Sequence, residues 1–155
     1  MGALSIALLT LLSDAASTGH KNRGQTHYKI AKIDGSVGGK LRLGRFEVTV
    51  PAGAYKGRAT ITLKVNDPSA KECHVDISPA NANKFAIPVT LTANVADAPK
   101  EKQEGLEILY FDQKHQVWTA VPGSQFDPAT GVVTAPLYHF SIYGVGSVLE
   151  GRSGW

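Results

Sequence analysis

Strict alternation of apolar and polar residues constrains the fold of this chain more than any other feature. From Arg58 to Val65 every odd position is apolar and every even position is polar. The run Phe46–Val50 has the same pattern, Pro51 follows it directly, and Gly53 comes two residues after the proline. Because side chains alternate between the two faces of a β-strand, both runs predict strands that bury one face. The proline and glycine predict the turn that ends the second run.

Similar short runs recur along the chain, separated by turn signals about every ten residues, and this rhythm is typical of sandwiches and barrels. Gly44 is expected to mark a bulge in one run, and Pro88 indicates either an edge strand or a strand that begins at Val89. The expected strands are 27–33, 41–50, 58–65, 73–77, 85–95, 106–111, 116–121, 132–137 and 139–145. We therefore predict an all-β fold, an antiparallel β-sandwich of about 8–9 strands, with a barrel as the main alternative.

Length and composition indicate one folded domain, and the charge distribution argues against nucleic-acid binding. A chain of 155 residues suits one domain, and 43% hydrophobic with 19% charged residues is ordinary for a folded soluble protein. The net charge of +3 is scattered, with its densest cluster at Lys21 and Arg23. Nucleic-acid binding needs a basic patch or stripe, so we do not predict it.

The N-terminal residues 1–16 resemble a signal peptide. The apolar stretch from Ala3 to Leu12 is too short to span a bilayer, and small residues follow it. No Lys or Arg precedes the stretch, so a start further upstream or a buried first helix or strand are the alternatives. The single cysteine, Cys73, forms no internal disulfide and is expected to be a small buried residue. These features predict export to a bacterial periplasm or cell surface, with no stable membrane span after signal removal.

The remaining chain is expected to have three parts. Residues 17–26 form a linker, residues 27–148 form the sandwich, and residues 149–155 form a flexible tail unless Trp155 docks on the domain.

Conventional active sites are not evident in the sequence. The five histidines are spread out and none pairs with another at metal-ligand spacing, so no metal and no cofactor are predicted. Asp97, Asp112 and Asp127 are interpreted as turn residues rather than as calcium ligands. Trp118 is expected to fill the core, and a carbohydrate-binding module is a weaker alternative because such modules usually display several exposed aromatic rings.

The tripeptide His139-Phe140-Ser141 is the one candidate catalytic group. A serine hydroxyl can attack the preceding carbonyl, which converts the amide to an ester that water then cleaves. The reaction requires a strained peptide bond, and His139 would act as base or polarise the carbonyl. The simpler interpretation is a strand in which His139 and Ser141 share one face and Phe140 points into the core.

Several segments in a fixed order resemble a known family. They are Gly38-Gly39, the strand ending Val48-Thr-Val-Pro-Ala-Gly-Ala54, Glu72-Cys73, Phe85-Ala-Ile-Pro-Val-Thr-Leu91, the Trp118 strand and His139-Phe-Ser141. Together they resemble the ZU-type (ZU-five) domain of ankyrins, zonula occludens scaffolds and netrin receptors, and they are most similar to the stand-alone versions in bacterial exported proteins.

The resemblance implies a β-sandwich that binds other proteins. In some relatives the domain cuts itself at a His-Phe-Ser sequence, which would make Ser141 the nucleophile, His139 its helper and Phe140–Ser141 the cleaved bond. We therefore expect a non-enzymatic interaction or structural module with a protein partner, for example as one subunit of a surface assembly. Self-cleavage is the alternative, and carbohydrate binding is the weaker one.

Overall fold

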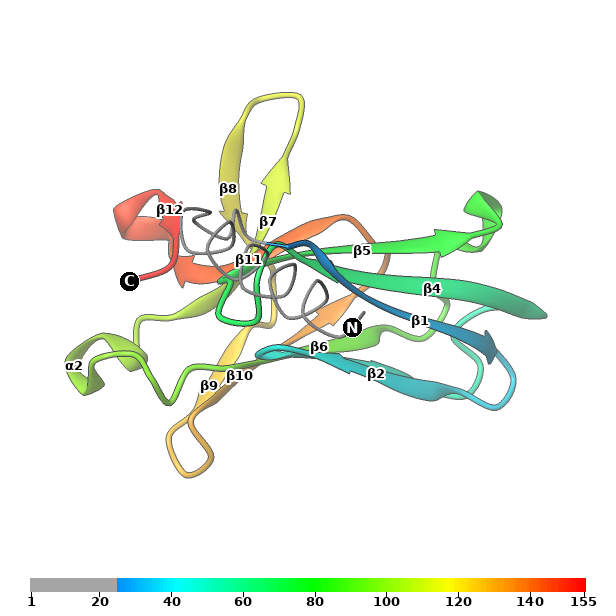
Figure 1. Cartoon of the computed structure of the whole chain (residues 1–155), viewed down its shortest axis with the longest axis horizontal. Helices are drawn as coiled ribbons and strands as arrows, with labels where there is room; N and C mark the ends of the chain where they lie inside the picture. The colour runs from blue at the N-terminus through cyan, green and yellow to red at the C-terminus, as the bar shows by residue number, and fades with distance from the viewer. Residues whose placement is uncertain (1–24) are drawn as a thin grey trace, which may run out of the picture.

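The computed structural model describes residues 25–155, which form two antiparallel β-sheets packed face to face (Figure 1). The expected signal peptide and residues 17–24 of the expected linker lie outside the described residues. Within the described residues, no strand of one sheet is hydrogen-bonded to a strand of the other, so the sheets do not close into a barrel. The predicted sandwich is therefore confirmed, and the barrel alternative is wrong.

The larger sheet has seven strands. In spatial order they are β1 (His27–Asp34), β4 (Arg58–Val65), β5 (Glu72–Ser78), β11 (Ile142–Ser147), β7 (Glu107–Asp112) and β8 (Val117–Ala120), and β12 (Arg152–Ser153) also pairs with β11. The smaller sheet has the order β2 (Gly39–Leu43), β3 (Phe46–Val50), β6 (Val89–Asn94), β10 (Val132–Leu137) and β9 (Gln125–Asp127). Short helical turns connect strands at α2 (Lys100–Gln103), η1 (Ala80–Ala82) and η2 (Val148–Glu150).

The core lies between the sheets and follows the sequence alternation. Along β4, the odd-numbered residues from Ala59 to Val65 are all buried, and the residues between them are only partly covered. Phe46 and Leu91 of the smaller sheet and Ile61 of the larger sheet are each 0% exposed. Full burial of a side chain of this size stabilises a fold by about 1.5–3 kcal/mol, so these inner faces hold the layers together.

The segment 41–50 forms a hairpin rather than the single bulged strand predicted. Leu41 and Leu43 in β2 lie opposite Val48 and Phe46 in β3, and the two-residue loop is Gly44-Arg45. Gly44 has a φ of 58°, a conformation that glycine adopts readily at the first position of a tight hairpin loop.

Other strand boundaries also differ from the expectation. β6 begins at Val89, which confirms the alternative based on Pro88. The short strands β9 and β12 were not predicted, and β11 begins at Ile142 rather than at His139.

Trp118 does not fill the core, so that prediction is wrong. Tyr143 and Val145 of β11 are core residues, so Gly144 between them faces away from the smaller sheet. The Trp118 ring lies over Gly144, 3.1 Å from where a Cβ would stand, and packs against Phe111 with ring centroids 5.0 Å apart. The ring is therefore half-buried on the outer face, and a Cβ at position 144 would crowd it.

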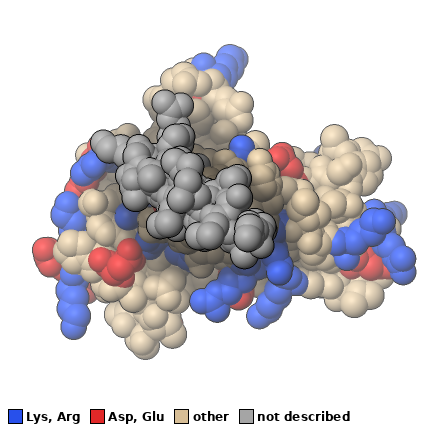
Figure 2. All heavy atoms as spheres, viewed as in Figure 1, with Lys and Arg blue, Asp and Glu red and all other residues tan. Residues whose placement is uncertain are grey.

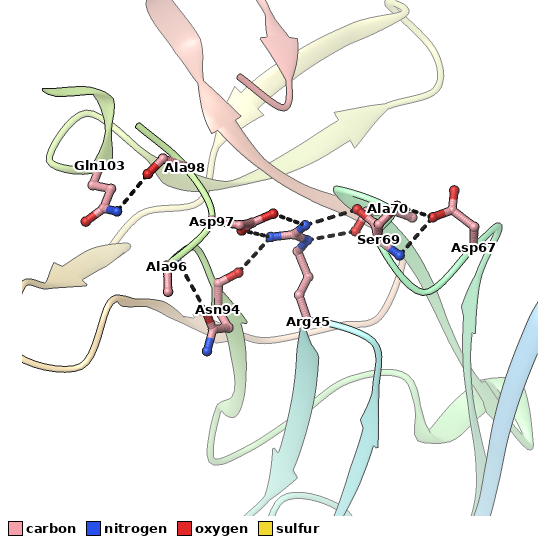
Figure 3. Close-up of polar contacts among 9 residues, drawn as sticks. All are labelled: Arg45, Asp67, Ser69, Ala70, Asn94, Ala96, Asp97, Ala98 and Gln103. Carbon is pink, nitrogen blue, oxygen red and sulfur yellow. Dashed lines mark hydrogen bonds and ion pairs between the residues drawn. The ribbon is translucent and has the colours of Figure 1, made fainter. Parts of the chain in front are cut away.

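Arg45 joins three loops at one end of the sandwich (Figure 3). Its guanidinium forms a two-pronged contact with Asp97, at 2.8 and 2.9 Å. It also donates to the backbone oxygens of Ala70 at 3.0 Å, Ser69 at 3.0 Å and Asn94 at 2.8 Å. All five N–H donors of the guanidinium are thus used, which offsets the cost of burying a charge whose side chain is only 7% exposed. These side-chain hydrogen bonds lower the pKa of Asp97.

Residues 149–155, expected as a flexible tail, instead return to the domain. β12 pairs with β11 in the register Gly146↔Ser153, and Trp155 packs against the core. The Trp155 ring lies 4.8 Å from the Arg45 guanidinium carbon and 4.6 Å from the Lys71 ammonium. Both cations are attracted by the face of the ring. Residues 149–155 therefore follow the alternative in which Trp155 docks on the domain.

We expect Arg45→Lys to lower the free energy of unfolding by about 2–3 kcal/mol, because one ammonium cannot serve a carboxylate and three carbonyls lying in different directions. Urea denaturation measures the change. The control is Arg42→Lys on the exposed face of β2, which should stay within about 0.5 kcal/mol of the wild type. Equal effects at the two positions would contradict the structural role of Arg45.

Candidate functional site

His139-Phe140-Ser141 lies in a bend between β10 and β11, where the chain crosses from the smaller sheet to the larger one. The prediction that the tripeptide lies within a strand is therefore wrong. At these residues the chain has left the ladder of one sheet and has not yet joined the ladder of the other. The expected orientation of Phe140 holds. Its ring is 4% exposed and meets Phe85 edge to face, with ring centroids 4.7 Å apart.

Asn83, which sequence reasoning missed, holds the backbone of this bend. The Phe140 N–H donates to Asn83 Oδ1 at 2.5 Å, and Asn83 Nδ2 donates to the Phe140 carbonyl at 3.1 Å. Asn83 directly follows η1, and nothing local in the sequence connects it to a residue so far along the chain. One side-chain amide thus replaces the ladder partners that Phe140 lacks in the bend.

The bend has further anchors on either side. The Tyr143 hydroxyl donates to the His139 carbonyl at 2.6 Å, and the Val75 N–H donates to the Ser141 carbonyl at 2.9 Å. Burial raises the pKa of Tyr143, so its hydroxyl keeps the proton that it donates.

The predicted catalytic residues are brought together only in part. The imidazole Nδ1 of His139 lies 3.4 Å from the Phe140 carbonyl oxygen, which also accepts from Asn83. Two nitrogen groups thus face the carbonyl that Ser141 would attack. Among residues 25–155, no hydrogen bond joins the Ser141 hydroxyl to His139, and neither Phe140 nor Ser141 has a positive φ. The arrangement can polarise the carbonyl, but it does not place a base beside the nucleophile.

An apolar pocket opens beside this bend, with a volume of about 310 Å³. We call it the tyrosine–proline pocket, and its lining includes Tyr110, Tyr138, Tyr143, Pro122, Pro136 and His139. It lies between β8 at the edge of the larger sheet and β10 of the smaller sheet, with Thr119 of β8 in its wall. The Tyr110 ring meets the His139 ring edge to face at 5.6 Å, and Tyr138 at the rim is 59% exposed.

The other candidate residues have structural roles. Asp97 binds Arg45, Asp112 lies 2.6 Å from Nδ1 of His115, and Asp127 accepts from the Ala129 N–H of its own turn. Hydrogen bonds from His115 lower the pKa of Asp112.

Cys73 is buried in the core as expected, and burial raises the pKa of its thiol. Within the described part of the chain, no three His, Cys, Asp or Glu side chains gather as a metal site would require.

No family model matches this chain, and none of the curated proteins matches it. The resemblance to ZU-type domains therefore stays a prediction from the sequence. Between residues 25 and 155 no helix has the length and apolar character needed to cross a bilayer.

We expect Asn83→Ala to lower the free energy of unfolding by about 1–3 kcal/mol, because it leaves the N–H and carbonyl of Phe140 without their side-chain partners. Asn81→Ala is the matched control, since Asn81 is an exposed residue of the same helical turn and should have little effect. Thermal and urea unfolding of the two variants measure the difference. Asn83→Ala as stable as Asn81→Ala would show that the amide does not hold the bend.

Proposed function

We propose that this domain is a non-enzymatic protein-binding module of an exported or cell-envelope protein, and that it binds its partner through the tyrosine–proline pocket. The observation that carries the proposal is an apolar pocket walled by three tyrosines and two prolines, with an open rim at the surface. A role as one subunit of a surface assembly fits the same surface.

The chemistry of the pocket supports a protein partner. Tyrosine is enriched at protein interfaces because its rigid ring contributes apolar area while its hydroxyl still accepts or donates a hydrogen bond. A volume of about 310 Å³ is at the lower end of the range for small-molecule sites. Such a hollow suits one inserted apolar or aromatic side chain, which is how binding energy concentrates at protein interfaces.

Site-specific photo-crosslinking tests this proposal in the organism that makes the protein. Benzoylphenylalanine in place of Tyr138, at the pocket rim, should give one discrete adduct with another protein. The same group in place of Gln113, at the tip of the β7–β8 hairpin, should not give that adduct. Thr119→Lys puts a charge in the pocket wall and should abolish the adduct. The proposal fails if position 138 gives no adduct, or gives the same products as position 113.

Self-cleavage between Phe140 and Ser141 is the second candidate function, and one observation favours it. Asn83 Nδ2 and His139 Nδ1 lie 3.1 and 3.4 Å from the Phe140 oxygen, where negative charge would develop when the hydroxyl attacks. Donors aimed at such an oxygen stabilise the tetrahedral intermediate; Asn83 Nδ2 is such a donor, and His139 Nδ1 is one in the tautomer that carries its proton there. The trans peptide counts against this candidate, as does the lack of a hydrogen bond between the Ser141 hydroxyl and a base among residues 25–155.

Intact-mass measurement separates the two functions. For a binding module we expect purified protein to remain one uncut species after prolonged incubation, identical in behaviour to Ser141→Ala. A fragment beginning at Ser141, formed by the wild type and absent from Ser141→Ala, would replace the first proposal by the second.

A further inference from the structure

β1 is an open edge of the larger sheet with backbone groups free to pair. The Gly35 N–H donates to the Gly57 carbonyl, which sets the alternation of hydrogen bonds between β1 and β4. In an antiparallel pair, bonded and non-bonded residues alternate, so the odd-numbered residues of β1 bond to β4. The N–H and C=O groups of Tyr28, Ile30 and Lys32 therefore point away from β4. No strand pairs with them in the described part of the chain.

Two large apolar side chains stand along this edge. Tyr28 is 57% exposed and Ile30 is 61% exposed, and their even-numbered positions place them on the outer face of the sheet. An added strand would cover both side chains with its own alternate residues. The edge thus matches a strand with an apolar residue at every second position.

Basic side chains surround the same edge. Lys29 and Lys32 are exposed on β1, and Lys40 and Arg42 are exposed on β2, which follows β1 around the corner of the sandwich. Figure 2 shows Lys and Arg side chains gathered where Figure 1 places these two strands. Two acidic groups nearby lie beside cations, since Glu47 is 3.7 Å from Lys40 and Asp34 is 3.9 Å from Arg58, and Asp67 lies near His27 at the start of β1. Lys29, Lys32 and Arg42 are in none of these pairs.

We propose that β1 binds an extended acidic segment of a partner protein, which adds to the larger sheet as a further strand. The inference deepens the proposed function, on which it rests, by naming a second contact surface and the chemistry of its partner. A second copy of this chain fits less well, because it would bring another Lys29 and Lys32 to an edge that is already basic.

The probe is a synthetic peptide of alternating glutamate and valine, about seven residues long, which is a usual strand length. The control probe has lysine in place of glutamate. Fluorescence anisotropy should show binding of the acidic peptide, weakened by added salt, and no binding of the basic one. Amide hydrogen exchange should slow at Tyr28, Ile30 and Lys32 when the acidic peptide is present.

Two variants test whether the edge itself binds. Lys29→Glu combined with Lys32→Glu should weaken binding of the acidic peptide by about tenfold or more. Lys100→Glu combined with Lys114→Glu makes the same change in net charge at distant exposed sites and should leave binding unchanged. Ile30→Pro removes one outward N–H without breaking a bond to β4, so it should weaken binding in a folded domain, as circular dichroism checks.

Three outcomes would overturn the proposal: no binding of the acidic peptide, binding that protects another edge such as β8 or β9, or protection of the β1 amides by self-association alone. Crosslinking at position 138 reports on the pocket at the opposite side of the larger sheet. An adduct there without peptide binding at β1 refutes this inference and keeps the proposed function.

Discussion

The burial of alternate side chains between two sheets is the constraint on which the rest of this structure depends. Phe46, Ile61 and Leu91 reach the space between the layers only if each strand keeps its register, because a slip of one residue turns every side chain to the other face. The core therefore fixes which residues remain at the surface. It leaves the sheet edges and the connecting loops as the places where this domain can contact other molecules.

At one end of the sandwich, the loops are held by hydrogen bonds and an ion pair rather than by core packing. Arg45 leaves the β2–β3 turn and binds Asp97 together with three backbone oxygens, while Trp155 covers the guanidinium. At the opposite side of the sheets, Asn83 does the same for the backbone of Phe140. Both contacts satisfy backbone groups where the chain leaves a ladder, and the Asn83 contact keeps the β10–β11 bend and the adjoining pocket in one shape.

The alternation in the sequence was sufficient to predict the two-layer antiparallel fold and most strands, because period-two patterning depends on burial alone. It was insufficient at the β2–β3 hairpin. There the apolar positions change from odd, at Leu43, to even, at Phe46, and a tight turn and a bulge both produce this change. Trp118 was assigned to the wrong face because its strand, β8, has apolar residues on both faces, Val117 on one and Trp118 on the other, so the pattern does not say which face meets the core.

The candidate site was less predictable than the fold. The sequence singled out His139, Phe140 and Ser141, but their relation to Asn83 and to the tyrosine–proline pocket arises from contacts between distant segments. Arg45 was missed for the same reason, since its partners lie 24–52 residues further along the chain. Side-chain contacts of this kind have no periodic signal, so only the three-dimensional arrangement reveals them.

The central claim is that neighbouring residues of one strand alternate between the buried inner face and the outer face of the sheet. Comparing Ile61→Ala with Thr62→Ala in urea unfolding tests it most directly. Ile61 is fully buried between the sheets, and Thr62 lies on the outer face. The account predicts that Ile61→Ala loses about 2–5 kcal/mol of stability, while Thr62→Ala loses less than about 1 kcal/mol. Equal losses, or a larger loss at Thr62, would contradict it.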